Sequence, residues 1–243
     1  SMIGELNEAQ TSWTTFEGNM RQIGKSPAEI SKAKNELQRF AEQTIYGAAD
    51  MSSTYSQLAA VGTKNTTTLV KGFGGLAAAA TNPAQAMKTL SEQATQMAAK
   101  PKVQWEDFKL MVQQTPAGMA AVAKTMGMSL TDLISKIQDG KIKTEDFFNA
   151  VAKTGTNANF SKMATQYKTI GDAVQGLKEQ ITNGLLKTWG KVSQIGIQAV
   201  NQLSDALSKV NFEKIGDGLL NGIKKFEPAF EELKTGFDDF KKG

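Results

Sequence analysis

Two pairs of adjacent acidic residues are the first candidates for chemistry in this sequence. Glu106 and Asp107 belong to the phrase KVQWEDFKLMV, and Glu145 and Asp146 belong to a second copy, KIKTEDFFNAVAKTG, 39 residues later. Paired carboxylates can perform general acid–base catalysis when they face each other across a substrate. Neighbouring residues of a helix point in different directions, whereas acids in its first turn stabilise it through the helix dipole. We therefore interpret both pairs as residues of helix starts and not as catalysts.

The composition removes most other routes to catalysis. The 243 residues include no His and no Cys. The sequence therefore offers no imidazole general base, no thiol nucleophile, no disulfide and no thiolate or imidazole metal site. We expect no enzymatic activity, no metal and no cofactor.

The charge pattern argues against a specific nucleic-acid partner. The net charge is +4, and only Arg21 and Arg39 among the 28 basic residues are Arg. Arg is the residue that reads guanine and phosphate in a bidentate manner. Scattered Lys residues are typical of solvated helix faces. We therefore expect partners other than specific nucleic-acid sites.

The longest apolar run is GFGGLAAAA at 72–80. It is shorter than the roughly 20 residues that span a bilayer. No Lys-Ser or Lys-Thr pair follows it at the spacing of a phosphate-binding loop. Polar residues interrupt the N-terminal region, so we also expect no signal peptide. We interpret the Gly and Ala residues of 72–80 as positions at which helices pack closely.

The repeated phrase fits the chemistry of a helix start. If Gln104 and Lys143 are N-caps, the acids at the third helical position lie beside free backbone N–H groups. An apolar residue before each cap can pack on a Phe at the fourth position as a hydrophobic staple. The same frame fits MSLTDLISKI at 128–137. The predicted helix-start residues are Val103, Asp107 and Phe108 in the first copy, Ser129, Asp132 and Leu133 in the middle, and Ile142, Asp146 and Phe147 in the last. We expect Gly118, Gly127, Gly140 and Gly155 to separate these helices, and a loop over 153–160.

The residues before this region also predict helices. Residues 1–45 predict an amphipathic hairpin, because apolar residues recur every three or four positions and SPAE at 26–29 is a capping box with Pro. Farther on, Asp50 or Ser52 is expected to cap a helix that Gly62 closes. Asn82-Pro83 is expected to open the next helix.

Residues 161–243 predict long amphipathic, coiled-coil-like helices. Apolar residues alternate at three- and four-residue spacing from Ile170 to Val210. An unbroken helix over 165–210 would be about 70 Å long. Because desolvated aromatic side chains dominate interfaces, the candidate protein-interaction residues are Trp189, Phe212, Phe226, Phe230, Phe237 and Phe240. The predicted fold is all-α, a bundle of short helices with long, heptad-patterned flanking helices.

Three motifs follow one another in a fixed order between 102 and 155. They comprise Lys102, Val103, Glu106, Asp107 and Phe108; then Pro116, Ala117, Met126, Gly127, Ser129, Asp132 and Leu133; then Gly140, Lys141, Ile142, Glu145, Asp146 and Phe147. This order resembles the conserved N-terminal domain of tail tape measure proteins from long-tailed phages and prophages. The resemblance extends over 46–190. The sequence departs from the family at 99–101, where Gly usually precedes the first Lys.

The resemblance implies a structural protein with a helical tape measure domain at 46–160. Such a protein is a scaffold that sets tail length and templates tail tube assembly, occupies the tube lumen in the virion and is released at DNA ejection. The implied partners are tail tube protein, tail assembly chaperones, tail tip proteins and further copies of the chain. Assembly would take place in the host cytoplasm, and membrane contact would occur only at infection.

Two alternatives from other classes remain open at the level of sequence. A secreted, membrane-active helical protein of toxin type could use the Gly/Ala-rich stretch and an amphipathic tail. A structural part of a tail-associated cell-wall hydrolase is the other alternative, since some tape measure proteins carry such domains. Liposome leakage and cell-wall zymography would distinguish them.

Overall fold

The computed structural model describes residues 2–166, 179, 182–184 and 186. The regular elements over these residues are α-helices, which confirms the predicted all-α class. They are α1 (Met2–Gln22), α2 (Pro27–Gln43), α3 (Ala48–Ala60), α4 (Thr66–Ala77), α5 (Pro83–Ala98), α6 (Trp105–Gln114), α7 (Pro116–Thr125), α8 (Leu130–Gln138), α9 (Thr144–Gly155) and α10 (Ala158–Thr165). The heptad pattern predicted over 165–210 lies almost entirely outside the described residues.

A left-handed glycine and a capping box define the boundary between α1 and α2. Gly24 takes a left-handed conformation, with φ of 85°, after the end of α1. Ser26 and Glu29 then form the predicted capping box, with the Ser26 hydroxyl accepting from the Glu29 N–H at 3.2 Å. An ion pair of 2.7 Å between Lys34 and Glu17 joins α2 to the last turns of α1.

Helix α3 begins earlier than predicted. Its N-cap is Gly47, in extended conformation, and not Asp50 or Ser52. Ser52 is buried and its hydroxyl donates to the Ala49 carbonyl, so it is an interior residue of the helix. The early start brings Ala48, which is also buried, into the helix. Gly62 follows the helix at φ of 80°, as expected for its end.

Helix α5 was predicted more accurately. The Asn82 side chain accepts from the Gln85 N–H at 3.1 Å, and Pro83 is the first helical residue. The apolar side chains that share one face of the sequence pattern, Met87, Leu90, Ala94 and Met97, are all buried.

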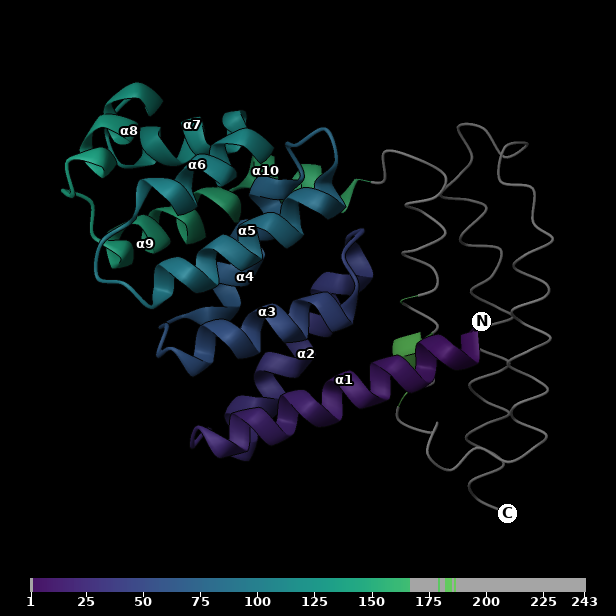
Figure 1. Ribbon diagram of the computed structural model, residues 1–243. Helices are drawn as coiled ribbons and strands as arrows, with labels where there is room; N and C mark the ends of the chain where they lie inside the picture. The colour runs from purple at the N-terminus through teal and green to yellow at the C-terminus, as the bar shows by residue number, and fades with distance from the viewer. Residues whose placement is uncertain (1, 167–178, 180–181, 185, 187–243) are drawn as a thin grey trace, which may run out of the picture. The chain divides into compact units, whose positions relative to one another are not determined.

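The Gly/Ala-rich stretch at 72–80 forms the second half of α4, which lies between α3, α5 and α9 (Figure 1). A methyl group on Gly72 would lie 2.7 Å from the carbonyl oxygen of Val151 in α9. Gly75 and Gly155 are closer still, since a methyl group on Gly75 would overlap the Gly155 carbonyl oxygen. The backbones of α4 and α9 therefore touch without intervening side chains, which confirms the close-packing interpretation. No helix among the described residues is long and apolar enough to cross a membrane.

The residues from Phe16 to Gln166 form one compact unit. Its core is formed by large side chains that are almost completely buried, among them Phe16, Leu37, Met51, Leu58, Phe73, Leu76, Phe108 and Phe147. At the first residue of this unit, the ring of Phe16 in α1 packs edge-on against Tyr55 in α3, with ring centroids 5.4 Å apart.

Tyr46 closes over the other side of α4. Its hydroxyl donates a hydrogen bond of 2.6 Å to the Gly74 carbonyl oxygen, and its ring stacks on Phe40. A methyl group on Gly74 would lie 2.7 Å from the Phe40 ring, so the missing side chain lets both rings approach the helix. Burial raises the pKa of the Tyr46 hydroxyl above its ordinary value of 10.0.

The Tyr46 hydroxyl is expected to make the compact unit sensitive to alkali. Because its pKa is higher in the folded chain than in the unfolded chain, its stabilising contribution is complete below about pH 10 and is lost as the pH rises further. In urea denaturation, the free energy of unfolding should fall above about pH 10 more steeply in the wild type than in Tyr46→Phe. At neutral pH the variant should lose about 1 kcal/mol with the hydrogen bond. Equal slopes in both proteins would contradict this expectation.

Candidate functional site

The two copies of the repeated phrase lie side by side in the structure. The Val103 N–H donates to the Ile142 carbonyl oxygen, and the Thr144 N–H donates to the Pro101 carbonyl oxygen, each at 3.0 Å. These bonds form an isolated antiparallel bridge between the segments that precede α6 and α9. The repeated phrase therefore places the starts of α6 and α9 next to each other. We call residues 100–108 and 142–147 the paired helix starts.

The aromatic residues of the two copies complete the pairing. The rings of Phe108 and Phe147 meet edge to face, with centroids 5.6 Å apart and an interplanar angle of 89°. Both rings have no exposed area, and Val103 and Ile142 beside the bridge are also buried. Edge-to-face rings add about 0.5–1.5 kcal/mol to the free energy of burial. Each copy thus supplies half of a shared apolar core.

The N-caps lie at the residues that the sequence frame assigns to them. They are Gln104 for α6, Ser129 for α8 and Lys143 for α9. The Ser129 hydroxyl accepts from the Asp132 N–H at 3.1 Å, whereas Gln104 and Lys143 form no side-chain cap bond. At those two helices, buried apolar residues and the bridge take the place of a capping side chain.

Asp107 has a contact that the sequence did not predict. Its carboxylate is buried, with 5% of the side chain exposed, and accepts a hydrogen bond of 3.0 Å from the Lys100 ammonium group. The Lys100 carbonyl oxygen in turn accepts from the Thr144 hydroxyl at 2.7 Å. Lys100 therefore links the start of α6 to the start of α9. The residues responsible lie in 99–101, the segment where the sequence departs from the usual family pattern.

The acid pairs do not form a converging carboxylate site. Asp107 is buried against Lys100, while Glu106, Glu145 and Asp146 are exposed to solvent. Over the described part of the chain, no group of three potential metal ligands comes together. The geometry supports a structural role for these acids in helix starts.

Replacing Asp107 with Asn is expected to lower the free energy of unfolding by about 1–2 kcal/mol. The substitution keeps the size of the side chain but removes its charge from a bond whose Lys partner is 45% exposed. Glu106→Gln is the matched control, since it removes a neighbouring charge that is exposed and should change stability by less than about 0.5 kcal/mol. Denaturant titration of both variants measures the difference, and equal losses would refute a specific role for Asp107.

A fourth helix, α7, lies between the predicted helix starts. Thr115 is its N-cap and accepts from the Gly118 N–H at 3.2 Å, and Pro116 is its first residue. The Thr115 hydroxyl also donates to the Leu76 carbonyl oxygen at the end of α4. The Thr-Pro pair is a helix-start signal in the sequence, but we predicted only a break between helices at Gly118.

One of the four predicted glycine breaks is wrong. Gly127 and Gly140 follow helices with φ of 80° and 68°, and Gly155 is the last residue of α9, as expected, but Gly118 lies inside α7. Gly118 is enclosed by Thr115, and Gly155 is needed for the close approach to α4. The loop predicted over 153–160 is likewise mostly helical, because α9 continues to Gly155 and Asn157 caps α10.

The candidate protein-interaction residues all lie outside the described residues. They are Trp189, Phe212, Phe226, Phe230, Phe237 and Phe240. The structure therefore leaves their proposed role as a prediction from the sequence.

The paired helix starts lie within a region that matches a known protein family. A family model described as tape measure protein matches residues 4–189, which include the paired helix starts and all of α2 to α10. The chain belongs to the tape measure protein family. No curated protein and no solved structure is significantly similar to it. The match confirms the resemblance seen in the sequence and extends it toward the N-terminus, from residue 46 to residue 4.

Tape measure proteins are structural proteins of phage tails, so family membership makes this chain a tail component of a virion. The matched region includes the predicted N-terminal hairpin, which the resemblance in the sequence did not cover. Both the hairpin and the paired helix starts are therefore part of one family region.

Proposed function

We propose that this chain is part of a helical scaffold that sets the length of a phage tail and templates the polymerisation of tail tube subunits. The family match over residues 4–189 is the observation that carries the proposal. The long amphipathic helix that the sequence predicts over 165–210 suits this role, since an α-helix adds a constant rise of about 1.5 Å per residue. In the virion the scaffold occupies the tube lumen, and it leaves the lumen at DNA ejection.

The proposed partners follow from this role. Tail tube protein surrounds the scaffold, tail assembly chaperones keep it in an assembly-competent state in the host cytoplasm, and tail tip proteins hold one end. Further copies of the chain can pack along the heptad-patterned region predicted over 165–210. The role requires neither catalysis nor a specific nucleic-acid site, and contact with a membrane is limited to infection.

Tail length measured by electron microscopy tests the proposal. In-frame deletions within 165–210 of the parent gene should shorten tails by about 1.5 Å per residue removed. Tails of normal length in reduced number would instead assign this segment to assembly or anchoring. Normal numbers of normal tails would mean that the segment neither measures nor assembles, and would contradict the proposal.

A second experiment tests the proposed interaction residues. Aromatic side chains that become desolvated at an interface often cost more than about 2 kcal/mol when truncated to Ala. Trp189→Ala should therefore weaken binding to tail tube protein by more than about tenfold in a titration. Unchanged affinity would remove Trp189 from the proposed interface.

A further inference from the structure

A groove beside the paired helix starts carries a charge pattern that the tape measure role does not explain. It encloses about 460 Å³ and lies where the loop from α3 to α4, the end of α5 and the first turns of α9 meet. Its apolar lining includes Val61, Ala98 and Phe148, and its charged lining includes Lys64, Lys100 and Lys143. We call it the lysine groove.

Val61 is the first unusual feature of the lysine groove. Its side chain is 43% exposed, and among the described residues the only other exposed large hydrophobic side chain is Ile23. The loop that carries Val61 is held in place by backbone hydrogen bonds, from the Gly62 N–H to Ala59 and from the Thr63 N–H to Leu58. Val61 is thus presented to solvent by an ordered loop, which lowers the entropy cost of binding there.

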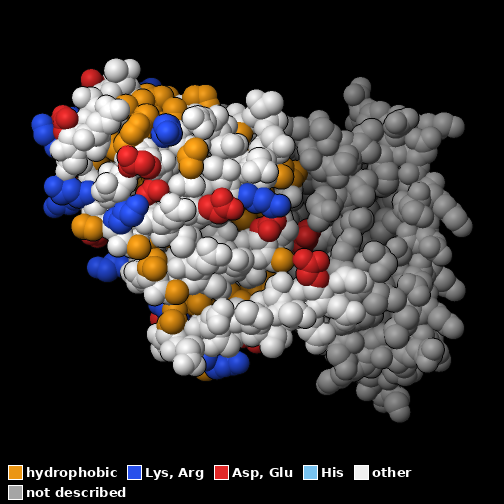
Figure 2. Space-filling view, viewed as in Figure 1, with side chains coloured by type: hydrophobic (Ala, Val, Ile, Leu, Met, Phe, Trp, Pro, Cys, Tyr) orange, Lys and Arg blue, Asp and Glu red, His pale blue; other side chains and the backbone are white. Residues whose placement is uncertain are grey.

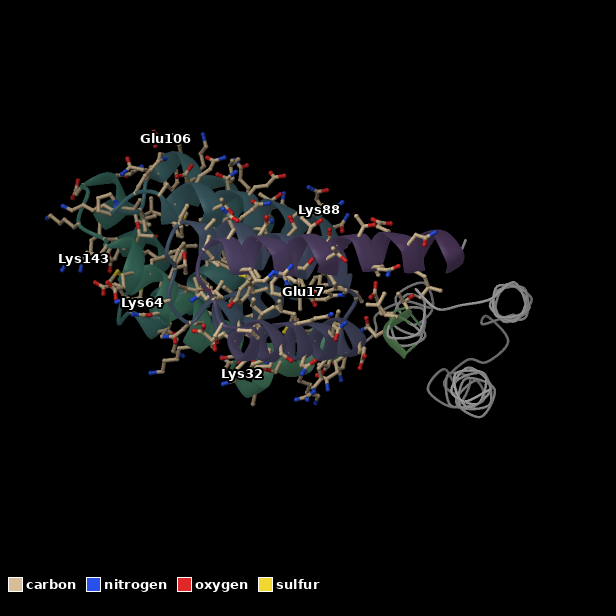
Figure 3. The ribbon with its side chains drawn as sticks, turned by 90° about the horizontal axis from the view of Figure 1, so that it is seen from below. Glu17, Lys32, Lys64, Lys88, Glu106 and Lys143 are labelled. Carbon is tan, nitrogen blue, oxygen red and sulfur yellow. The ribbon has the colours of Figure 1, made fainter. Side chains whose placement is uncertain are left out.

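The lining of the groove carries a net positive charge. It includes three Lys residues and one acid, Glu145. Because Lys100 is paired with Asp107, the remaining charges of Lys64, Lys143 and Glu145 leave a local charge of about +1. Lys100 is paired with Asp107, but Lys64 and Lys143 form no ion pair with any described residue. Both are exposed, and Figure 3 shows them at the same end of the compact unit. Figure 2 shows further basic side chains, all of them Lys in this part of the sequence, along the edge formed by α8 and α9.

Two helix N-termini strengthen this positive potential. Asn65 is the N-cap of α4 and Lys143 the N-cap of α9, and neither side chain forms a cap hydrogen bond. Both residues line the groove. Because the N-terminus of a helix carries a partial positive charge, these two helices add to the field of the Lys residues. The potential is complementary to an acidic ligand.

We propose that the lysine groove is a docking site for an acidic polypeptide segment of a partner, with one apolar side chain between its acidic residues. The apolar side chain would pack on Val61, Ala98 and Phe148, while the carboxylates would face Lys64 and Lys143. The apolar lining favours a polypeptide over a nucleic acid as the ligand, since a phosphate backbone would not cover Val61. Docking here is independent of whether the chain measures tail length.

Fluorescence anisotropy with defined peptides tests the proposal on the full chain. The probes are labelled heptapeptides with three acidic residues on each side of a central Leu, Phe or Val. The control peptides replace the central residue with Gly or the acidic residues with Lys. At least one acidic probe should bind about tenfold more tightly than both of its controls, and its affinity should fall about tenfold between about 50 and about 300 mM salt.

Two surface variants locate the binding. Lys64→Glu/Lys143→Glu should lower the affinity for the acidic probe by at least about tenfold, and Val61→Ser should lower it by about threefold. Lys88→Glu/Lys109→Glu changes the net charge equally at exposed residues outside the groove. Its affinity for the acidic probe should stay within about twofold of the wild-type value. Unchanged thermal melting shows that the variants are folded.

Several results would overturn the proposal. They are failure of all three acidic probes to bind the wild type, equal losses in the two double variants, and tighter binding of a single-stranded oligonucleotide than of any acidic probe. Because tail length is not measured, these results bear on the groove alone. A failed deletion experiment would bear only on the proposed function.

Discussion

Replacing Gly75 with Ala is expected to lower the free energy of unfolding of the compact unit by about 3 kcal/mol. In an ordinary helix the same change would raise stability by up to about 1 kcal/mol, because Ala has the higher helix propensity. Here the new methyl group would overlap the carbonyl oxygen of Gly155, a backbone atom of α9 that no rotamer change can move. The helices must separate, and the buried contacts around them are weakened. Denaturant titration of the full chain measures the loss.

Gly18→Ala is the matched control for this prediction. Gly18 lies within α1, and a methyl group there would meet no heavy atom within 4 Å. The same substitution should therefore stabilise the protein, by about 0.5–1 kcal/mol. Opposite signs of the stability change at the two positions would establish that backbone contact, and not glycine flexibility, explains why Gly75→Ala destabilises the unit. Stabilisation at both positions would show that α4 and α9 are not in close contact.

Phe147→Ala is expected to cost about 3–5 kcal/mol, the range found for truncating a fully buried Phe. Phe147 contacts the rings of both Phe108 and Phe148, so its removal leaves a cavity at the centre of the paired helix starts. The first turns of α6 and α9 should lose protection against hydrogen exchange along with global stability. A loss below about 1 kcal/mol would show that the two copies do not share a core.

A double-mutant cycle separates the contact between the two copies from simple burial. Phe108→Leu and Phe147→Leu keep most of the apolar volume and should each cost less than the Ala variants. The coupling energy between them should be about 0.5–1.5 kcal/mol if the edge-to-face contact contributes beyond its area. Additive losses would leave burial as the only contribution of the rings.

The sequence predicted best those elements whose signals are local. Ser26 with Glu29 and Asn82 with Pro83 start helices through hydrogen bonds within four residues, so their effect does not depend on the rest of the fold. The helix starts at Gln104, Ser129 and Lys143 were predictable because their frame is repeated. Repetition also indicated a shared role, although not that the copies pair with each other.

Elements that depend on distant contacts were less predictable. Helix α4 is mostly buried, and its N-cap Asn65 has a left-handed conformation without a cap bond, so no local capping signal marks where the helix begins. The end of α9 at Gly155 was predicted from the sequence, but the contact of Gly155 with α4 was not. The bond from Lys100 to Asp107 depends on the turn between α5 and α6, and the lysine groove depends on three segments that are far apart in the sequence.

The compactness of the unit from Phe16 to Gln166 has a consequence for how such a gene can change over evolution. Roughly 150 residues would span about 225 Å as one helix, but a packed unit of that size has a radius of gyration of only about 15 Å. Insertions in its exposed loops, such as residues 62–65, would therefore leave tail length unchanged. Damage to its core would reduce the number of tails and not their size. Under the proposed function, lineages with longer or shorter tails should differ in chain length outside this unit and agree in length within it.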